Sequence, residues 1–507
     1  MSMENNFYIE NQANFDKYRN HEFKPGDTIF FRRGVTYQGQ FNPTGSGKKN
    51  APIQVKAFGE GDTLPVINGS ETDIGVFNLL NADYWHIFDL EITGGTVFGF
   101  NANITDTSRI YHQIYLDNVV VHDMAGMVNG SNGAAGTAGI RVNITDRAML
   151  RDVKITNCKA YDLNWWAGIA VGGSSSSHDG NWSEETIWRY DAIVNIEIKN
   201  CHVYNTMGNG ITTGCCTNSL IEDCLAHDCG QYELQDVYQT PVGIWSVYAR
   251  NAVIRRCEVY GQKTYSTIGD GDGGAFDIDY SCENFLIEHC YGHDNHGAGV
   301  LLCAVDWGWN QNVTRNSIIR HNIFANNANN ARNTECDIYV HQWGTGTNAY
   351  FDGVQIYNNT FYWNPANKEI PCVRSNGEIE NTVRGSLPNV FANNIIYSTV
   401  PYLVDLPDNF QIDNNLYYYT GDSSDAYWTY DNQKLHWEDV VKVEPNSLMM
   451  DPNVAGDFKQ SNRFKLSSTS PAIGKGKMVL DIGDTDYYGN EIKPAGPWSI
   501  GADNGNL

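Results

Sequence analysis

Four aspartates crowd into one short stretch, Asp270-Gly-Asp272-Gly-Gly-Ala-Phe-Asp277-Ile-Asp279. Asp277 and Asp279 alternate with a Phe and an Ile, so both carboxylates project from the outer face of a strand if the apolar pair points into a core. Crowded carboxylates repel one another, and this raises the pKa of at least one of them. A protonated carboxyl beside an ionised one is the arrangement that glycoside hydrolysis uses. The stretch is therefore a candidate catalytic site.

The spacing leaves the stereochemistry open. Retaining glycosidases place their two carboxyls about 5–5.5 Å apart and inverting ones about 6.5–9.5 Å apart. Residues i and i+2 of a strand have Cα atoms about 6.6 Å apart, which allows either separation. The alternative interpretation is a structural acidic turn or a calcium site, because Asp-Gly runs are common in turns. No cofactor is expected, apart from such a structural calcium ion.

Other residues around this stretch could bind a sugar. Asp270 lies on the Gly-rich turn, and His293 and His296 follow in the next segment, His293-Asp-Asn-His-Gly-Ala-Gly299. Their side chains could contact a sugar hydroxyl or orient a carboxylate, although a histidine in such a turn is more often a hydrogen-bonded spacer. Aromatic side chains that could stack on pyranose rings flank the region, although any single one is more often a packing residue. The tryptophans concerned are Trp245, Trp307 and Trp309.

A repeat supplies the elements that must position these residues. Segments of the form Ile-x-x-Cys or Ile-x-x-Asn, with Phe391 in place of the Ile once, are followed by a second short apolar run and recur at intervals of a few tens of residues. Their fourth residues are Cys158, Cys201, Cys224, Cys257, Cys290, Asn322, Asn359, Asn394 and Asn415. Short β-branched runs broken by Asn and Gly favour strands, and one unit cannot bury its own apolar face. The sequence predicts an all-β protein, a single right-handed parallel β-helix with inserted loops and capped ends.

The repeat also explains five of the twelve cysteines. Equivalent residues on successive coils lie about 4.8 Å apart, so the fourth position predicts an internal column of thiols that continues as a column of Asn amides. A disulfide framework is the alternative, and zinc is disfavoured because the sequence has no Cys-x-x-Cys pair.

Three regions are expected along the chain. Residues 1–24 form an N-terminal cap that can include a short helix, and residues 25–420 form the β-helix with a catalytic cleft around 240–310. Residues 421–507 form a C-terminal closing segment packed on the helix. Such caps are needed because an open stack exposes strand edges and apolar core.

The charge of the chain restricts the classes of partner that it can bind. The chain has 507 residues and a formal net charge of −25, which disfavours nucleic acid and polyanionic sugars. No Lys or Arg occurs between Lys263 and Arg315. A polysaccharide lyase on the same fold, which must neutralise a uronate, is therefore less favoured than a hydrolase of a neutral glycan. A non-catalytic glycan-binding β-helix is the third alternative.

The string Asp272-Gly-Gly-Ala-Phe-Asp277-Ile-Asp279 with the segment 293–299 resembles the core of β-helix glycoside hydrolases of gut bacteria, among them the lacto-N-biosidase type. That family carries two catalytic aspartates seven residues apart, and both Asp272/Asp279 and Asp270/Asp277 fit. The resemblance implies Asp272 as acid/base, Asp279 as nucleophile and Asp277 as support, hence retention. It also implies release of a disaccharide such as lacto-N-biose and the need for a dedicated folding partner.

Two features of the sequence bear on the localisation of the protein. No apolar run approaches the roughly 18 residues of a membrane span, so no membrane insertion is expected. The first twenty residues lack the basic and apolar regions of a signal peptide. An extracellular or cell-surface bacterial location is slightly favoured, with a native signal segment missing from this sequence.

Overall fold

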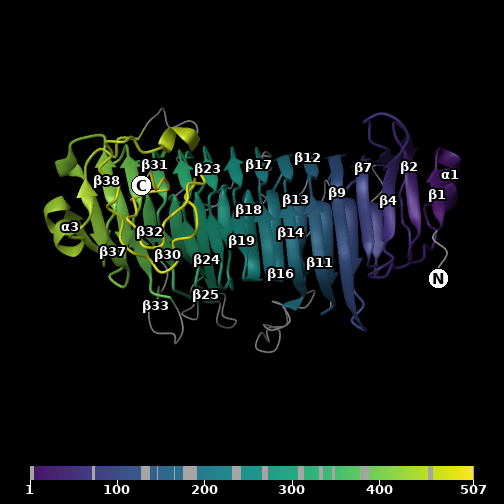
Figure 1. The fold of residues 1–507 in the computed structure, drawn as a ribbon, viewed down its shortest axis with the longest axis horizontal. Coiled ribbons are helices and arrows are strands. Elements are labelled where there is room, and N and C mark those ends of the chain that lie inside the picture. The colour runs from purple at the N-terminus through teal and green to yellow at the C-terminus, as the bar shows by residue number, and fades with distance from the viewer. Residues whose placement is uncertain are drawn as a thin grey trace. The chain divides into compact units, whose positions relative to one another are not determined.

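The computed structural model describes most of the chain. The described residues are 5–70, 75–126, 138–145, 147–164, 166–174, 191–230, 241–264, 272–306, 313–330, 335–344, 349–376, 379–380, 387–454 and 461–505. They form two compact units, Met1–Ile244 and Trp245–Leu507. Both consist of parallel strands that pair with the equivalent strand of the next coil (Figure 1). The predicted all-β, parallel β-helix fold is confirmed.

In the first unit, the strands form three parallel columns after a short N-terminal strand and helix. The elements are β1 (Asn6–Ile9), α1 (Gln12–Tyr18), β2 (Thr28–Arg32), β3 (Thr36–Gln38), β4 (Ile53–Phe58), β5 (Val66–Asn68), β6 (Gly75–Leu80), β7 (Trp85–Thr93), β8 (Phe98–Ile104), β9 (Ile110–Met124), β10 (Ala138–Thr145), β11 (Met149–Thr156), β12 (Lys159–Leu163), β13 (Ala167–Ser174), β14 (Ile193–Lys199), β15 (His202–Thr206), β16 (Asn209–Glu222) and β17 (Leu225–His227).

The second unit repeats this plan. Its column-A strands are β18 (Ile244–Arg250), β21 (Phe276–Ile278), β24 (Val300–Asp306), β28 (Ile338–Gly344), β32 (Val373–Ser375), β36 (Tyr402–Leu406) and β39 (Tyr427–Tyr430), with β40 (Gln433–His436) antiparallel to β39. Column B has β19 (Val253–Arg255), β22 (Leu286–Glu288), β26 (Ile318–Arg320), β30 (Gln355–Tyr357), β34 (Val390–Ala392) and β37 (Gln411–Asp413).

Column C has β20 (Glu258–Tyr260), β23 (Tyr291–His293), β27 (Ile323–Ala325), β31 (Thr360–Trp363), β35 (Ile395–Ser398), β38 (Leu416–Tyr419) and β41 (Leu448–Met449). A small three-stranded sheet has β25 (Val313–Arg315), β29 (Tyr350–Asp352) and β33 (Ile379–Glu380). The helical elements are α3 (Trp437–Val443) and two 3₁₀ turns, Ser423–Asp425 and Ser461–Phe464. Among the described helices, none is long and apolar enough to cross a membrane.

Left-handed backbone at fixed corners turns the chain from one column to the next. Asn157, Asn200, Asp223, Asn358 and Asn393 precede the fourth repeat position, and each has a φ between 52° and 55°. Asn and Asp tolerate this conformation better than other residues with a Cβ. The third residue of each repeat therefore encodes a corner.

The fourth repeat position forms the predicted internal column. All twelve cysteines are buried and free, which excludes the disulfide framework. Burial and the adjacent thiols of Cys158 and Cys224 raise the pKa of Cys201, as expected for stacked thiols. In the second unit, Asn322 Nδ2 donates to Asn359 Oδ1 (3.0 Å), and the column continues through Asn394 to Asn415.

The C-terminal segment of the second unit docks on the same corner column. His289 Nε2 lies 3.0 Å from the carbonyl oxygen of Thr485, and His321 Nε2 lies 2.7 Å from that of Ile482. Further along the column, Asn393 Nδ2 and Asn414 Nδ2 donate to carbonyl oxygens of Lys477 (2.9 Å) and Lys475 (3.0 Å). Side chains at the corners thus hold the closing segment by its backbone.

Candidate active site

Strand β21 presents its carboxyls on the outer face of the coil. The ring of Phe276 lies against the interior glycine Gly292, where a Cβ would meet it at 3.3 Å, and both Phe276 and Ile278 are fully buried. Because side chains alternate along a strand, Asp277 and Asp279 point the other way. Asp277 is nevertheless only 4% exposed. The predicted orientation holds, and Asp277 is enclosed whereas Asp279 is partly exposed.

Burial shifts the pKa values of both groups, and like charge adds to the shift of Asp277. Burial raises the pKa of Asp277 well above its usual range, and the carboxylates of Asp279, Asp272 and Glu335 raise it further. Burial also raises the pKa of Asp279 to about 6, against hydrogen bonds from the Tyr280 backbone N–H and the Cys303 thiol that favour its ionised form. These shifts favour the protonated form of Asp277, whereas Asp279 is largely ionised at neutral pH.

The Gly-rich turn before β21 lies against the two following coils. Gly297 N donates to Gly273 O (2.9 Å), and Ala298 N donates to Glu335 Oε2 (2.8 Å). A Cβ on Gly297 would lie only 2.6 Å from Glu335 Oε2 and 2.7 Å from Asp272 O, so only glycine fits here. The turn thus brings Glu335, fully buried, to the aspartates. Sequence reasoning missed it because the repeat pattern does not mark residue 335.

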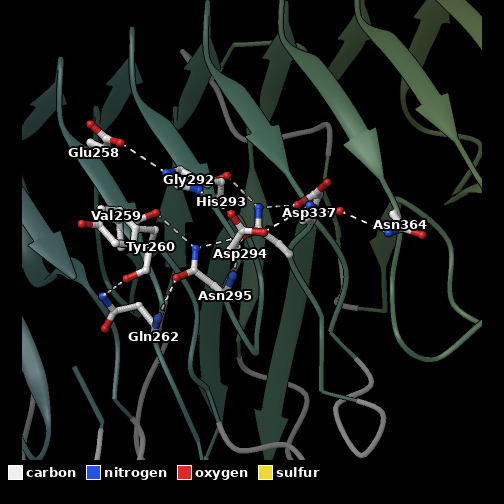
Figure 2. Close-up of polar contacts among 12 residues, drawn as sticks. Glu258, Val259, Tyr260, Gln262, Gly292, His293, Asp294, Asn295, Asp337 and Asn364 are labelled. Atoms are coloured by element: carbon white, nitrogen blue, oxygen red, sulfur yellow. Dashed lines mark hydrogen bonds and ion pairs between the residues drawn. The ribbon is translucent and has the colours of Figure 1, made fainter. Parts of the chain in front are cut away.

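A second missed carboxyl, Asp337, ends an internal amide ladder (Figure 2). Asn295 Nδ2 donates to Asn327 Oδ1 (2.8 Å), and Asn327 Nδ2 donates to Asp337 Oδ1 (2.8 Å). Burial raises the pKa of Asp337 to about 8, although the bond from Asn327 works against this rise. Asp337 also abuts Gly299, whose Cβ would lie 3.0 Å from Asp337 Oδ1. This carboxyl faces the coil interior and is a neutral structural group.

The two predicted histidines have different surroundings. His293 lies on β23, where Nε2 is 3.2 Å from Glu258 Oε1 and Nδ1 is 2.8 Å from Asp294 Oδ2 (Figure 2). Burial lowers its pKa, but the two carboxylates outweigh this effect and raise it above the usual value. Since β23 pairs with β20 and β27, His293 belongs to another face of the coil than β21. We therefore do not retain it as a sugar ligand.

His296, by contrast, lies next to the Gly-rich turn, one residue before Gly297. Its backbone N–H donates to Gln262 O (3.0 Å), and its ring Nδ1 lies 3.3 Å from both the N and the O of Thr264. Burial lowers the pKa of His296, so the imidazole is neutral. Its local contacts fit the spacer role that was the alternative at the outset.

Of the remaining predicted sugar ligands, one is among the described residues. Trp245 lies on β18, the column-A strand that pairs with β21, and is half-buried. Asp270, Trp307 and Trp309 lie outside the described residues. Among the described residues, no three His, Cys, Asp or Glu side chains are arranged to hold a metal ion.

The outer face of column A continues past the carboxyls to a cation. Register pairs Leu301 with Asp277, Tyr339 with Leu301, and Arg374 with Tyr339. The face therefore contains an arginine although no Lys or Arg lies between residues 263 and 315. The argument from that gap against a lyase is accordingly weaker than the sequence suggested, because the gap covers only part of the face.

The family of right-handed β-helix regions matches residues 138–361, which agrees with the predicted hand. No curated protein sequence matches the chain. Among solved structures, the native GH136 lacto-N-biosidase from Eubacterium ramulus is similar with 19% identity and a TM-score of 0.50, over 74% of this chain and 67% of that one. Its selenomethionine derivative is similar with 18% identity and a TM-score of 0.53, over 75% of this chain and 67% of that one. An alginate lyase from Paenibacillus sp. is similar with 16% identity and a TM-score of 0.42, over 66% of this chain and 99% of that one. The likeness to the biosidase shows the fold.

Proposed function

We propose that this protein is a glycoside hydrolase that cleaves a neutral oligosaccharide or glycan. The observation that carries the proposal is the enclosed carboxyl of Asp277. Its Oδ1 has no hydrogen-bond partner among the described residues. Burial raises the pKa of this carboxyl, and three neighbouring carboxyls raise it further. A buried polar atom without a partner calls for a ligand, and perturbed carboxyls cluster at catalytic sites. A sugar hydroxyl is a ligand of suitable chemistry.

The proposed mechanism gives each of the three aspartates one role. Asp279, ionised at neutral pH, attacks the anomeric carbon while Asp272 gives its proton to the departing oxygen. A covalent glycosyl ester results. Asp272 then takes a proton from water, the water oxygen attacks the anomeric carbon, and the ester bond to Asp279 breaks with retention. Asp277, which keeps its proton, supports the pair as a hydrogen-bond donor.

Two finer points are part of the proposal. The biosidase likeness, together with the pair Asp272 and Asp279 spaced seven residues apart, makes a disaccharide such as lacto-N-biose the first product to seek. A dedicated folding partner belongs to the same proposal, and co-expression with neighbouring genes is the way to supply one if the chain alone is insoluble.

The test is a screen of aryl glycosides and milk or mucin oligosaccharides, with product mass and anomeric form recorded. Asp272→Asn and Asp279→Asn are each expected to lower kcat at least a thousandfold while thermal unfolding stays cooperative. Asp294→Asn, at a half-exposed carboxylate beside His293, is the matched control. Turnover at the wild-type rate by both site variants would refute the assignment of Asp272 and Asp279 as catalytic residues.

One observation favours a second candidate, a polysaccharide lyase. Tyr339 and His341 lie on the same face as the aspartates, and a lyase needs a Tyr or His side chain as its base. Uronate polymers therefore belong in the same screen, where the unsaturated product of a lyase is detected by its ultraviolet absorbance.

A further inference from the structure

Polar and aromatic side chains continue along the outer face of column A for three strands beyond the aspartates. The register places Tyr339 on β28, Arg374 on β32 and Asp405 on β36 in one line with Asp277. Neighbouring strands are about 4.8 Å apart, so Arg374 lies about 14 Å along the coil axis from Asp277. A single monosaccharide held at the carboxyls does not reach it.

Arg374 is part of a connected set of side chains. Its Nε lies 3.5 Å from Asp405 Oδ2, and the two side chains are 27% and 26% exposed. Tyr402 is hydrogen-bonded to both Asp405 and Thr429. The ring of Tyr402 stacks on that of Tyr427 at 4.5 Å. Planar donors and acceptors beside an aromatic ring suit the hydroxyl groups and the apolar face of a pyranose.

A second polar set lies between Arg374 and the aspartates. His341 Nδ1 lies 2.7 Å from Asn376 Oδ1, and Asn376 Nδ2 donates to the Tyr339 hydroxyl at 3.3 Å. His341 pairs in register with Cys303, the residue whose thiol contacts Asp279. Polar side chains therefore continue from the catalytic carboxyls to Arg374.

We propose that Arg374, Asp405 and Tyr402 form a distal subsite that binds a further sugar residue of a neutral chain, at least one unit away from the cleaved bond. The substrate then lies along the coil axis across column A. This inference rests on the proposed hydrolase function and adds the direction and minimum length of the substrate. Asp405 already balances the charge of Arg374, so the pair is matched to hydroxyls and not to a carboxylate or sulfate.

The test compares an aryl monoglycoside, an aryl disaccharide and a neutral tetrasaccharide with the same terminal sugar. Arg374→Met keeps most of the apolar stem and removes the donors. It is expected to lower kcat/KM for the tetrasaccharide about tenfold more than for the aryl monoglycoside, the size of one lost charge-assisted hydrogen bond. The control is Arg33→Met, which breaks the Arg33–Asp89 pair of similar exposure (19% and 35%) in the first unit.

An equal loss on short and long substrates would overturn the subsite, as would a preference of the wild type for sialylated or sulfated chains that Arg374→Met abolishes. If the wild type cleaves nothing, the hydrolase proposal fails separately. Calorimetric titration of the tetrasaccharide then decides the subsite, because weaker binding by Arg374→Met than by Arg33→Met supports it and equal binding refutes it.

Discussion

The thiol of Cys303 is predicted to set the pH at which the site becomes active. Its hydrogen bond to Asp279 favours the ionised carboxylate, while burial holds the pKa of Asp279 at about 6. Ionised Asp279 is the proposed nucleophile, so kcat/KM of the wild type is expected to fall about tenfold for each pH unit below about 6.

Cys303→Ala removes this bond. A hydrogen bond to a charged group contributes about 1.5–3 kcal/mol, and a thiol is a weak donor, so a loss of about 1 kcal/mol is expected. One pKa unit corresponds to 1.36 kcal/mol, so the pKa of Asp279 rises by roughly 0.7 unit. The acidic limb of the pH profile therefore shifts to higher pH by that amount, and kcat/KM at pH values above the limb changes little.

The measurement is kcat/KM against pH on one aryl glycoside for the wild type, Cys303→Ala and Cys282→Ala. Cys282 is the control because its buried thiol donates to the backbone oxygen of Ser246. An acidic limb that stays in place in Cys303→Ala, or that moves equally in both variants, would refute the reasoning.

Two further predictions concern buried carboxyls of the second unit. Glu444 accepts hydrogen bonds from Ser447 (2.6 Å), Tyr417 and Tyr430, so Glu444→Gln is expected to lower the unfolding free energy by about 1–3 kcal/mol in urea; an unchanged midpoint would contradict this. Asp337 has a pKa of about 8 against about 3.9 unfolded, so its stabilising contribution is lost as pH rises from about 4 to 8. Asp337→Asn should therefore gain thermal stability over the wild type across that range, and parallel melting curves would contradict it.

The fold was predictable from the sequence because two adjacent positions of the repeat have characteristic residue types. The fourth position gave the internal column of thiols and amides. The third position contains Asn, Asp or His at most coils, which marks corners in left-handed conformation. The sequence could not show that His289 and His321 also hold the closing segment, because their partners are backbone carbonyls that carry no residue signature.

The site was predictable only within one coil. Asp277 and Asp279 follow from strand alternation, since both lie on the same short strand. Glu335 and Arg374 come from later coils, and inserted residues between coils hide which positions are in register. Sequence reasoning assigned no role to Cys303, because only the pairing of β21 with β24 places it beside Asp279.

Two other buried carboxyls of the second unit are each paired with an arginine. Glu288 is paired with Arg320 at 2.9 Å, and Asp352 with Arg315 at 3.2 Å. Asp277 instead has three acidic neighbours that raise its pKa after burial. Enclosing like charges costs stability, and natural sequences retain such conflicts where function requires them. The crowding of three carboxyls around a fourth buried one is therefore a physical reason, independent of any relative, to propose catalysis at β21.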